Sequence, residues 1–371
     1  MKNRYQKTGC TDQGHGIRRI VQFLLTVIVM MGLAATAFAN DIKSKAAVVM
    51  DAETGRLLYA KNPDLRLLPA STTKLMTALV VLERAKLSDV VTISRKVSLT
   101  PAMRIGLKEG DKVTVETLLY AALMKSANDA AVALSEAVAG SEEQFVILMN
   151  RKAIALGAND TRFINANGLP GKGQYITAYD LSKIMRAAIK YPVLKEILNT
   201  RITEVATESG KTMFIKNTNK LLWSDEELLG GKTGYTRQAR HCFVCAGERD
   251  KDTIIVALLG APARDLLWKE SEELLTFGSR VMNKTEEPVV YLARADAGPM
   301  KASRAVYTKT DDTAPEKITV SSKGKAKGKK LAAAKKRKSA KSVSRHAKHR
   351  QLKKKLRGTQ MAQKGIDEPK G

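Results

Sequence analysis

The chain has 371 residues, of which 44% are hydrophobic, and this is enough to bury the core of one large domain or two ordinary ones. The formal net charge of +27 is unevenly distributed, because residues 321–357 hold 17 Lys or Arg and no Asp or Glu. The rest of the chain is only mildly basic, so composition excludes a chain that is basic or disordered throughout.

The first 39 residues are typical of a secretory signal peptide. Arg18 and Arg19 precede an apolar run of 14 residues, 20–33, and residues 37–39 (AFA) form a cleavage site of the small-x-small type. An uncleaved anchor is the alternative, but a spanning helix needs about 20 apolar residues. We therefore expect Asn40 as the mature N-terminus of an exported protein, in the periplasm or at the cell-envelope surface, either free or peripheral to the inner membrane.

Residues 40–280 alternate strand-like and helix-like segments and form the predicted main domain. Apolar periodicity predicts helices over residues 75–85, 116–124, 128–139, 180–190 and 270–282. Strand-like runs occupy residues 46–50 and 57–59, as a hairpin, and residues 243–246 and 253–259. Residues 281–320 are a weakly structured linker with one candidate strand at 289–292. Residues 321–371 are of low complexity and are predicted to form a disordered basic tail.

Cys242 and Cys245 are the two cysteines outside the signal peptide, and their C-x-x-C spacing also occurs in redox and zinc sites. Residues 241–246 are strand-like, however, and residues three apart in a strand face opposite sides. No second cysteine pair is present to complete a metal site. We expect two buried structural thiols, no metal and no cofactor.

Three short motifs follow one another with separations of 55 and 106 residues. They are residues 71–74 (STTK) at a helix start, 126–128 (SAN) between two helical segments and 232–234 (KTG) in a strand-like segment. Singly, each would usually be a helix cap or an ordinary turn. As an ordered set, S-x-x-K, S-D-N and K-T-G mark class A β-lactamases and penicillin-binding proteins. Ala127 stands here in the place of the Asp.

The first motif predicts a serine nucleophile with a lysine base. Ser71 and Lys74 share a helix face, and N–H groups at a helix start can stabilise an oxyanion. Of the four histidines only His241 lies outside the signal peptide and the tail, and it is expected to be a bystander at a strand edge. A lysine becomes a base when burial or a nearby cation lowers its pKa, and Lys232 can supply that charge.

With their flanking residues, these motifs resemble the D-alanyl-D-alanine carboxypeptidase family of low-molecular-weight penicillin-binding proteins. The resembling segments are 69–78 (PASTTKLMTA), 123–131 (LMKSANDAA), 165–169 (NANGL), 177–181 (TAYDL), 217–219 (NTN) and 231–236 (GKTGYT). The resemblance implies an α/β fold of the β-lactamase/transpeptidase type, with an antiparallel sheet packed between helices and a helical subdomain over about 90–170. Residues 40–280 would then be a D,D-peptidase catalytic domain with its site between the two parts.

The resemblance also implies a role for each motif residue. Ser71 attacks the carbonyl of the penultimate D-alanine, Lys74 takes its proton, and Ser126 relays a proton to the leaving amine. Backbone N–H groups of Ser71 and Tyr235 form the oxyanion hole. The implied substrate-binding residues are Asn128, Lys232, Thr233, Gly234 and Tyr235. The implied partners are peptidoglycan stem peptides and, as covalent inhibitors, β-lactams.

Two other functions remain open at this point. A D,D-endopeptidase would cut peptidoglycan cross-bridges with the same residues. A catalytically idle wall-binding scaffold would result if Arg240, a bulky cation where the family usually has Ala-Gly, has spoiled the site. Class A β-lactamases use an additional Glu for deacylation, and none lies between Glu143 and Glu196, so we expect β-lactams to leave slowly. Family members often have an arginine just past the Gly-Ala that ends the next strand, and here Arg264 follows Gly260 and Ala261.

The basic tail is expected to hold the protein on an anionic membrane or cell-wall surface, in place of the amphipathic anchor helix of many family members. Each Lys or Arg near an anionic membrane contributes roughly 1 kcal/mol, and less as salt rises. We expect no nucleic-acid partner, because the protein is predicted to be exported and the tail has no aromatic residue to stack on bases.

Overall fold

The computed structural model describes residues 42–101 and 103–291. The predicted signal peptide, the basic tail and most of the predicted linker lie outside these residues. Within the described part, no helix combines the length and the hydrophobicity that a membrane span requires.

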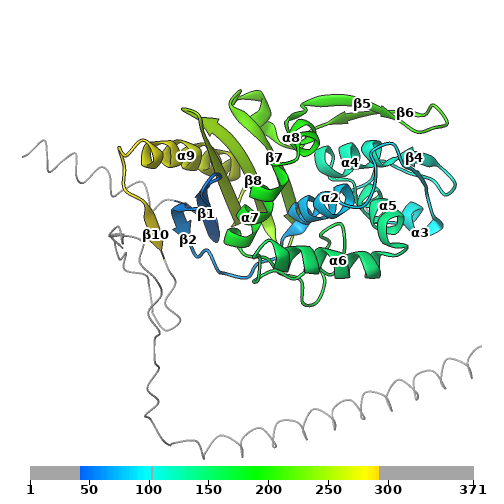
Figure 1. Ribbon diagram of the computed structural model, residues 1–371, viewed down its shortest axis with the longest axis horizontal. Coiled ribbons are helices and arrows are strands. Elements are labelled where there is room, and N and C mark those ends of the chain that lie inside the picture. Colours follow the sequence, from blue (N-terminus) through cyan, green and yellow to red (C-terminus); the bar gives the residue numbers. More distant parts are fainter. Residues whose placement is uncertain (1–41, 102, 292–371) are drawn as a thin grey trace, which may run out of the picture. The chain divides into compact units, whose positions relative to one another are not determined.

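A six-stranded sheet lies at the centre of the described domain, in the order β10-β2-β1-β9-β8-β7 (Figure 1). Its strands are β1 (Ala46–Asp51), β2 (Leu57–Lys61), β7 (Leu228–Thr236), β8 (Arg240–Arg249), β9 (Asp252–Ala261) and β10 (Val289–Tyr291). Neighbouring strands are antiparallel, except that β10 pairs in parallel with β2. The predicted antiparallel sheet is thus present, with one parallel edge strand, because the helix between β9 and β10 returns the chain to the end of the sheet where β9 begins.

Helices cover both faces of the sheet, and alternate residues of the central strands supply the two cores. Along β1, Val48 belongs to one buried cluster and Val49 to the other, as the two-residue period of a strand requires. One face packs against α9 (Arg264–Met282) and the other against α7 (Ala178–Ala188), while α8 (Pro192–Asn199) packs on β7. The helix predicted from Glu270 begins six residues earlier, at Arg264, and the added residues include the buried Leu267 and Trp268.

A mainly helical part lies beside β7 and the start of α2 (Lys74–Leu82) (Figure 1). Its elements are β3 (Val90–Thr92), α3 (Arg95–Ser98), β4 (Lys112–Thr114), α4 (Val115–Met124), α5 (Asn128–Ala139) and α6 (Glu142–Ala155). The hairpin of β5 (Ile202–Ala206) and β6 (Thr212–Lys216) adjoins it. The sequence did not predict α6, α8 or this hairpin. In α6 only Phe145, Met149 and Ala153 are buried, and so narrow a stripe gives little periodic signal.

The two cysteines are free, buried and on opposite faces of β8, as predicted. Cys242 belongs to the core under α7 and Cys245 to the core under α9. Burial raises the pKa of the Cys242 thiol to about 12, which makes it unreactive at neutral pH. Among the described residues, no group of three or more His, Cys, Asp or Glu is arranged to hold a metal ion.

Candidate active site

The nucleophile motif spans the junction between a short 3-10 turn, η2 (Ala70–Thr73), and α2. Ser71 therefore precedes the α-helix that the motif was expected to open, and Lys74 is its first residue. In a 3-10 turn residues three apart are eclipsed, which brings Lys74 Nζ to 3.1 Å from Ser71 Oγ. Ala70 has a φ of 48°, which is rare for a residue with a Cβ, and this bend presents Ser71 to the site.

Lys74 is fully buried and its three ammonium donors have defined partners. Besides Ser71, Nζ donates to Asn128 Oδ1 at 2.8 Å and to the carbonyl of Asn167 at 2.6 Å. Burial, and then the positive charge of Lys232, hold the pKa of Lys74 well below its usual value, while Asp129 opposes them. A neutral amine beside Ser71 Oγ can accept the serine proton, and the charge of Lys232 favours that neutral form.

A second serine–lysine pair stands opposite the first. Ser126 lies between α4 and α5 with a left-handed φ of 66°, and Lys232 Nζ donates to its Oγ at 2.8 Å. Lys232 also donates to the carbonyl of Thr233 at 2.9 Å. Burial lowers the pKa of Lys232 to about 7. Lys232 can therefore hold or give up a proton near neutral pH while it contacts Ser126 Oγ.

The third motif brings the edge strand β7 against the nucleophile. A Cβ at Gly234 would lie 2.9 Å from the Ser71 nitrogen and 3.1 Å from the Pro69 oxygen, so only glycine allows this approach. Thr233 Oγ1 shares a 2.7 Å hydrogen bond with Thr218 Oγ1. Tyr235 follows at the pocket mouth, with 57% of its surface exposed.

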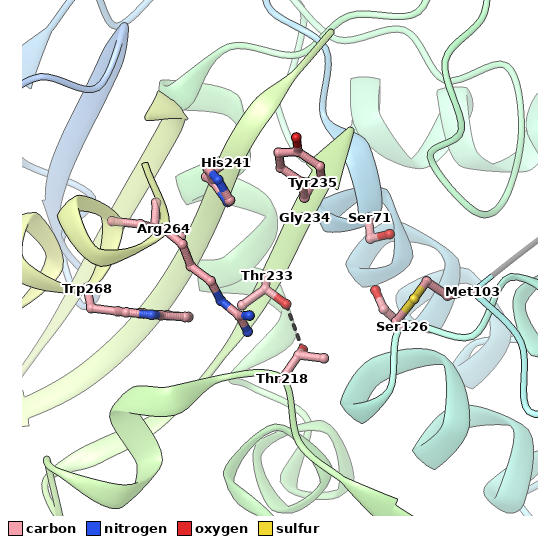
Figure 2. A pocket seen from close by; sticks show the side chains of 11 residues that line it. Ser71, Met103, Ser126, Thr218, Thr233, Gly234, Tyr235, His241, Arg264 and Trp268 are labelled. Carbon is pink, nitrogen blue, oxygen red and sulfur yellow. Dashed lines mark hydrogen bonds between the residues drawn. The ribbon is translucent and has the colours of Figure 1, made fainter. Parts of the chain in front are cut away.

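A cavity of about 300 Å³ joins these elements (Figure 2). Its lining residues are Ser71, Met103, Ser126, Thr218, Thr233, Gly234, Tyr235, His241, Arg264, Leu267 and Trp268. Five of the eight residues that the sequence singled out therefore face the cavity. The others, Lys74, Asn128 and Lys232, are buried behind Ser71 and Ser126. Lys74 is hydrogen-bonded to Ser71 and Lys232 to Ser126, while Asn128 accepts a hydrogen bond from Lys74.

His241, expected to be a bystander at a strand edge, is part of this lining. It pairs with Tyr235 across β7 and β8, and the two ring centroids are 4.5 Å apart. The sequence also missed Met103, Thr218, Leu267 and Trp268. Of these only Thr218 had a signal, as part of the NTN segment, because the other three approach the cavity only through the tertiary fold.

Arg240 does not enter the cavity. It occupies the turn between β7 and β8 with a φ of 64°, and its Nη2 donates to the Pro262 carbonyl at 2.8 Å. The left-handed backbone turns the side chain toward that carbonyl, so Arg240 lies near the site, next to His241, without lining it. Arg264, from the first turn of α9, instead extends toward Thr233 and Thr218 (Figure 2).

The second motif also holds the loop that carries Met103 to the cavity. The Asn128 N–H donates to the Met103 carbonyl at 2.7 Å, and Nδ2 donates to the Pro101 carbonyl at 3.3 Å. The buried carboxylate of Asp129 accepts three further backbone N–H groups of this loop, from Ile105, Gly106 and Leu107. The loop on one side of the cavity is therefore hydrogen-bonded to Asn128, which also contacts Lys74, and to the neighbouring Asp129.

These features define a serine hydrolase of the acyl-transfer type with lysine as its base. A hydroxyl nucleophile, a buried amine of lowered pKa and a second proton carrier converge on one cavity beside a strand edge. The comparisons with known proteins identify the family. The family model described as D-alanyl-D-alanine carboxypeptidase matches residues 33–263, and the chain belongs to this family.

Named relatives and solved structures agree with this assignment. The D-alanyl-D-alanine carboxypeptidase DacF of Bacillus subtilis is 34% identical over 259 residues, which cover 66% of this chain and 67% of DacF. The D-alanyl-D-alanine endopeptidase of Escherichia coli is 31% identical, with 69% of this chain and 84% of the relative covered. The crystal structure of the Streptomyces K15 DD-transpeptidase superposes with a TM-score of 0.61 at 33% identity, covering 64% and 97% of the two chains.

Proposed function

We propose that this chain is a serine-type D-Ala-D-Ala carboxypeptidase, which removes the terminal D-alanine of peptidoglycan stem peptides through an acyl-enzyme on Ser71. The observation that carries the proposal is the 3.1 Å contact between Ser71 Oγ and the buried amine of Lys74. A serine hydroxyl is a poor nucleophile until a base removes its proton, and a desolvated lysine supplies that base at neutral pH.

Acylation uses both serine–lysine pairs. Neutral Lys74 takes the Ser71 proton as Oγ attacks the carbonyl carbon of the penultimate D-alanine, and the carbonyl oxygen becomes an oxyanion held by the backbone N–H groups of Ser71 and Tyr235. The peptide bond then breaks. Ser126, hydrogen-bonded to Lys232, passes a proton to the departing nitrogen, so that D-alanine leaves as an amine rather than as an amide anion.

The cationic end of the cavity suits the terminal carboxylate of the substrate. Thr233 and Thr218 offer hydroxyl donors there, and the Arg264 guanidinium extends toward both (Figure 2). The Lys232 ammonium lies behind Thr233. The proton that Lys74 took from Ser71 replaces the one that Ser126 gave to the leaving amine, so Lys74 is neutral again once D-alanine has left. Lys74 then takes a proton from the water that attacks the ester and returns it to Ser71 Oγ as the shortened peptide is released.

Release of free D-alanine tests the proposal. The purified chain and its Ser71→Ala variant are incubated with a peptide that ends in Lys-D-Ala-D-Ala. We expect D-alanine from the first and none above background from the second. An equal yield from both proteins would contradict the assignment of Ser71, and covalent labelling by a fluorescent penicillin, mapped to Ser71, provides an independent measure of the nucleophile.

The endopeptidase alternative requires the same residues and differs only in the leaving group. It is favoured by the similarity to the E. coli endopeptidase, 84% of which is covered by the match. Cross-linked muropeptides separate the two activities, because an endopeptidase releases two shorter stems without free D-alanine. Absence of every product and of penicillin labelling would leave the idle scaffold, although Arg240 is directed to Pro262 and so provides no reason for an inactive site.

We further propose export, with removal of residues 1–39, and attachment of the tail to an anionic membrane or cell-wall surface. The 17 cations within residues 321–357 support this function, because each adds roughly 1 kcal/mol of attraction at low salt. The test compares the full chain with a deletion after Val320 for co-sedimentation with anionic vesicles and with isolated cell walls. Equal retention of both proteins at low salt would contradict the proposal.

A further inference from the structure

The cavity extends past Ser71 and the two threonine hydroxyls that the proposed function uses, and Arg264 borders both regions. Beyond Thr233, on the side away from Ser71, it continues between His241, Arg264 and Trp268 (Figure 2). Leu267 completes this end. A terminal D-alanine bound with its carboxylate at Thr233 has only a methyl group to place in this space. The extension is therefore larger than the smallest leaving group needs.

The wall of this extension is rigid and partly apolar. Trp268 is 9% exposed and packs edge-on against Phe243, with ring centroids 5.1 Å apart. On the other side, His241 lies against the Tyr235 ring, with the two ring planes tilted by 35°. An aliphatic side chain can lie between such rings, since apolar surface and a few polar groups are the usual lining of a ligand pocket.

The charge of the extension has one sign. Arg264 provides a permanent cation and His241 a titratable one, while none of the lining residues among those described is an Asp or Glu. Strands β7 and β9 and the first turn of α9 surround His241. It pairs with Tyr235 of β7 and with Ala261 of β9. The charged groups that act on His241 are Arg264, Arg240 and, with the opposite sign, Asp265.

We propose that His241, Arg264, Leu267 and Trp268 form a subsite for a leaving D-amino acid whose side chain is longer than methyl and ends in an anion, and that His241 sets this charge preference. The inference rests on the proposed function, because it assigns the leaving group to the Thr233 side of Ser71. D-alanine would bind and leave the subsite empty.

Protonation gives His241 a distinct signature. Burial, together with repulsion from Arg264 and Arg240, lowers its pKa, so the ring is neutral at pH 8 and gains charge as the pH falls. A side-chain carboxylate remains ionised down to about pH 4.3. Attraction between the two groups should thus increase at low pH for an anionic leaving group and not for its neutral isostere.

The experiment uses the full chain and two peptides that end in D-Ala-D-Glu and D-Ala-D-Gln, whose leaving groups have the same size. The quantity measured is the ratio of kcat/KM for D-Glu to that for D-Gln, at pH 8 and at pH 5.5. Titration of Lys74 and Lys232 cancels in this ratio. We expect the ratio to rise about threefold to fivefold at the lower pH, the effect of one added charge at the distance of a pocket wall.

His241→Phe keeps an aromatic ring against Tyr235 and removes the charge, so its ratio should stay constant with pH. Arg237→Gln is the matched control: it removes an exposed cation from the same β7–β8 turn outside the cavity lining and should keep the wild-type rise. An equal rise in His241→Phe, or a flat ratio in the wild type, would overturn the assignment of His241.

Two further outcomes concern the subsite itself. Release of D-alanine from Lys-D-Ala-D-Ala without release of either longer residue would overturn the subsite and leave the proposed carboxypeptidase intact. Release of nothing from all three peptides, with no penicillin labelling of Ser71, would remove the proposed function and the subsite with it.

Discussion

Gly168 packs directly on the backbone of Ala70, the residue before the nucleophile. A Cβ at Gly168 would lie 1.8 Å from the Ala70 carbonyl oxygen, and Gly168 has a φ of +85°. The neighbouring Asn167 carbonyl accepts a hydrogen bond from Lys74 Nζ at 2.6 Å. This loop therefore supports both the strained bend at Ala70 and the base.

Gly168→Ala should displace the nucleophile. The clash is with backbone atoms that cannot rotate away, so we expect a loss of stability of at least about 1–2 kcal/mol and a fall of about 10²-fold or more in the rate of penicillin acylation. Stopped-flow acylation and urea unfolding measure the two effects. Gly140→Ala is the control, because Gly140 has a φ of +74° with nothing within 4 Å of the added carbon. A similar loss of acylation in both variants would contradict this explanation.

Lys232→Met should move the pH dependence of acylation upward. The rate rises with pH as Lys74 loses its proton, and the charge of Lys232 helps to lower the pKa of Lys74. Without that charge the pKa of Lys74 rises, and the midpoint of the acid limb should shift to higher pH. The measurement is the pH, between 5 and 10, at which the acylation rate reaches half of each variant's own maximum, so a lower maximal rate does not affect the comparison. A downward shift would show that Lys232 does not act on Lys74 in this way.

Asp129→Asn should shift the same midpoint in the opposite direction. The Asp129 carboxylate raises the pKa of Lys74, so its neutralisation lowers that pKa and the acid limb moves to lower pH. Weaker bonds to the loop N–H groups should also reduce stability by about 1–3 kcal/mol. Asp111→Asn is the comparison, because Asp111 likewise accepts a loop N–H, from Lys108. Identical midpoints in the two variants would contradict a charge effect of Asp129 on Lys74.

Glu270→Ala should destabilise the domain without changing the site. Glu270 is 2% exposed, and its carboxylate accepts hydrogen bonds from the Lys43 N–H and from the N–H and hydroxyl of Ser44. Its removal leaves these donors unpaired, at a cost of about 1–3 kcal/mol in urea unfolding. Glu272→Ala changes an exposed carboxylate on the same helix and should stay within about 0.5 kcal/mol of wild type. Equal losses would indicate a general helix effect.

Penicillins should acylate Ser71 and leave slowly. None of the cavity-lining residues among those described is a carboxylate that could activate water on the far side of the ester. General-base catalysis typically contributes about 10²–10⁴-fold, so deacylation should be slower than acylation by a factor of this order. Intact mass spectrometry over time follows the adduct on Ser71. Rapid turnover of penicillin with no accumulated adduct would contradict the prediction.

The order and spacing of the motifs were enough to predict the nucleophile, its lysine base and the family. Ser71 and Lys74 are three residues apart, and in a helical turn side chains at this spacing lie next to each other whatever the rest of the fold. The strand period likewise placed Cys242 and Cys245 on opposite faces, as the structure confirms. The Ser71–Lys74 contact and the opposite orientation of the two cysteines both depend only on local backbone geometry. They can therefore be predicted from the sequence.

Only the tertiary structure decided what surrounds the nucleophile. Ser126 and Lys232 are 106 residues apart and meet because β7 passes beside the turn between α4 and α5. His241 enters the cavity while Arg240, its neighbour, turns away to Pro262, a difference that follows from one left-handed residue. The low pKa of Lys74 comes from burial and from a charge brought near by folding, and neither is a property of its local sequence.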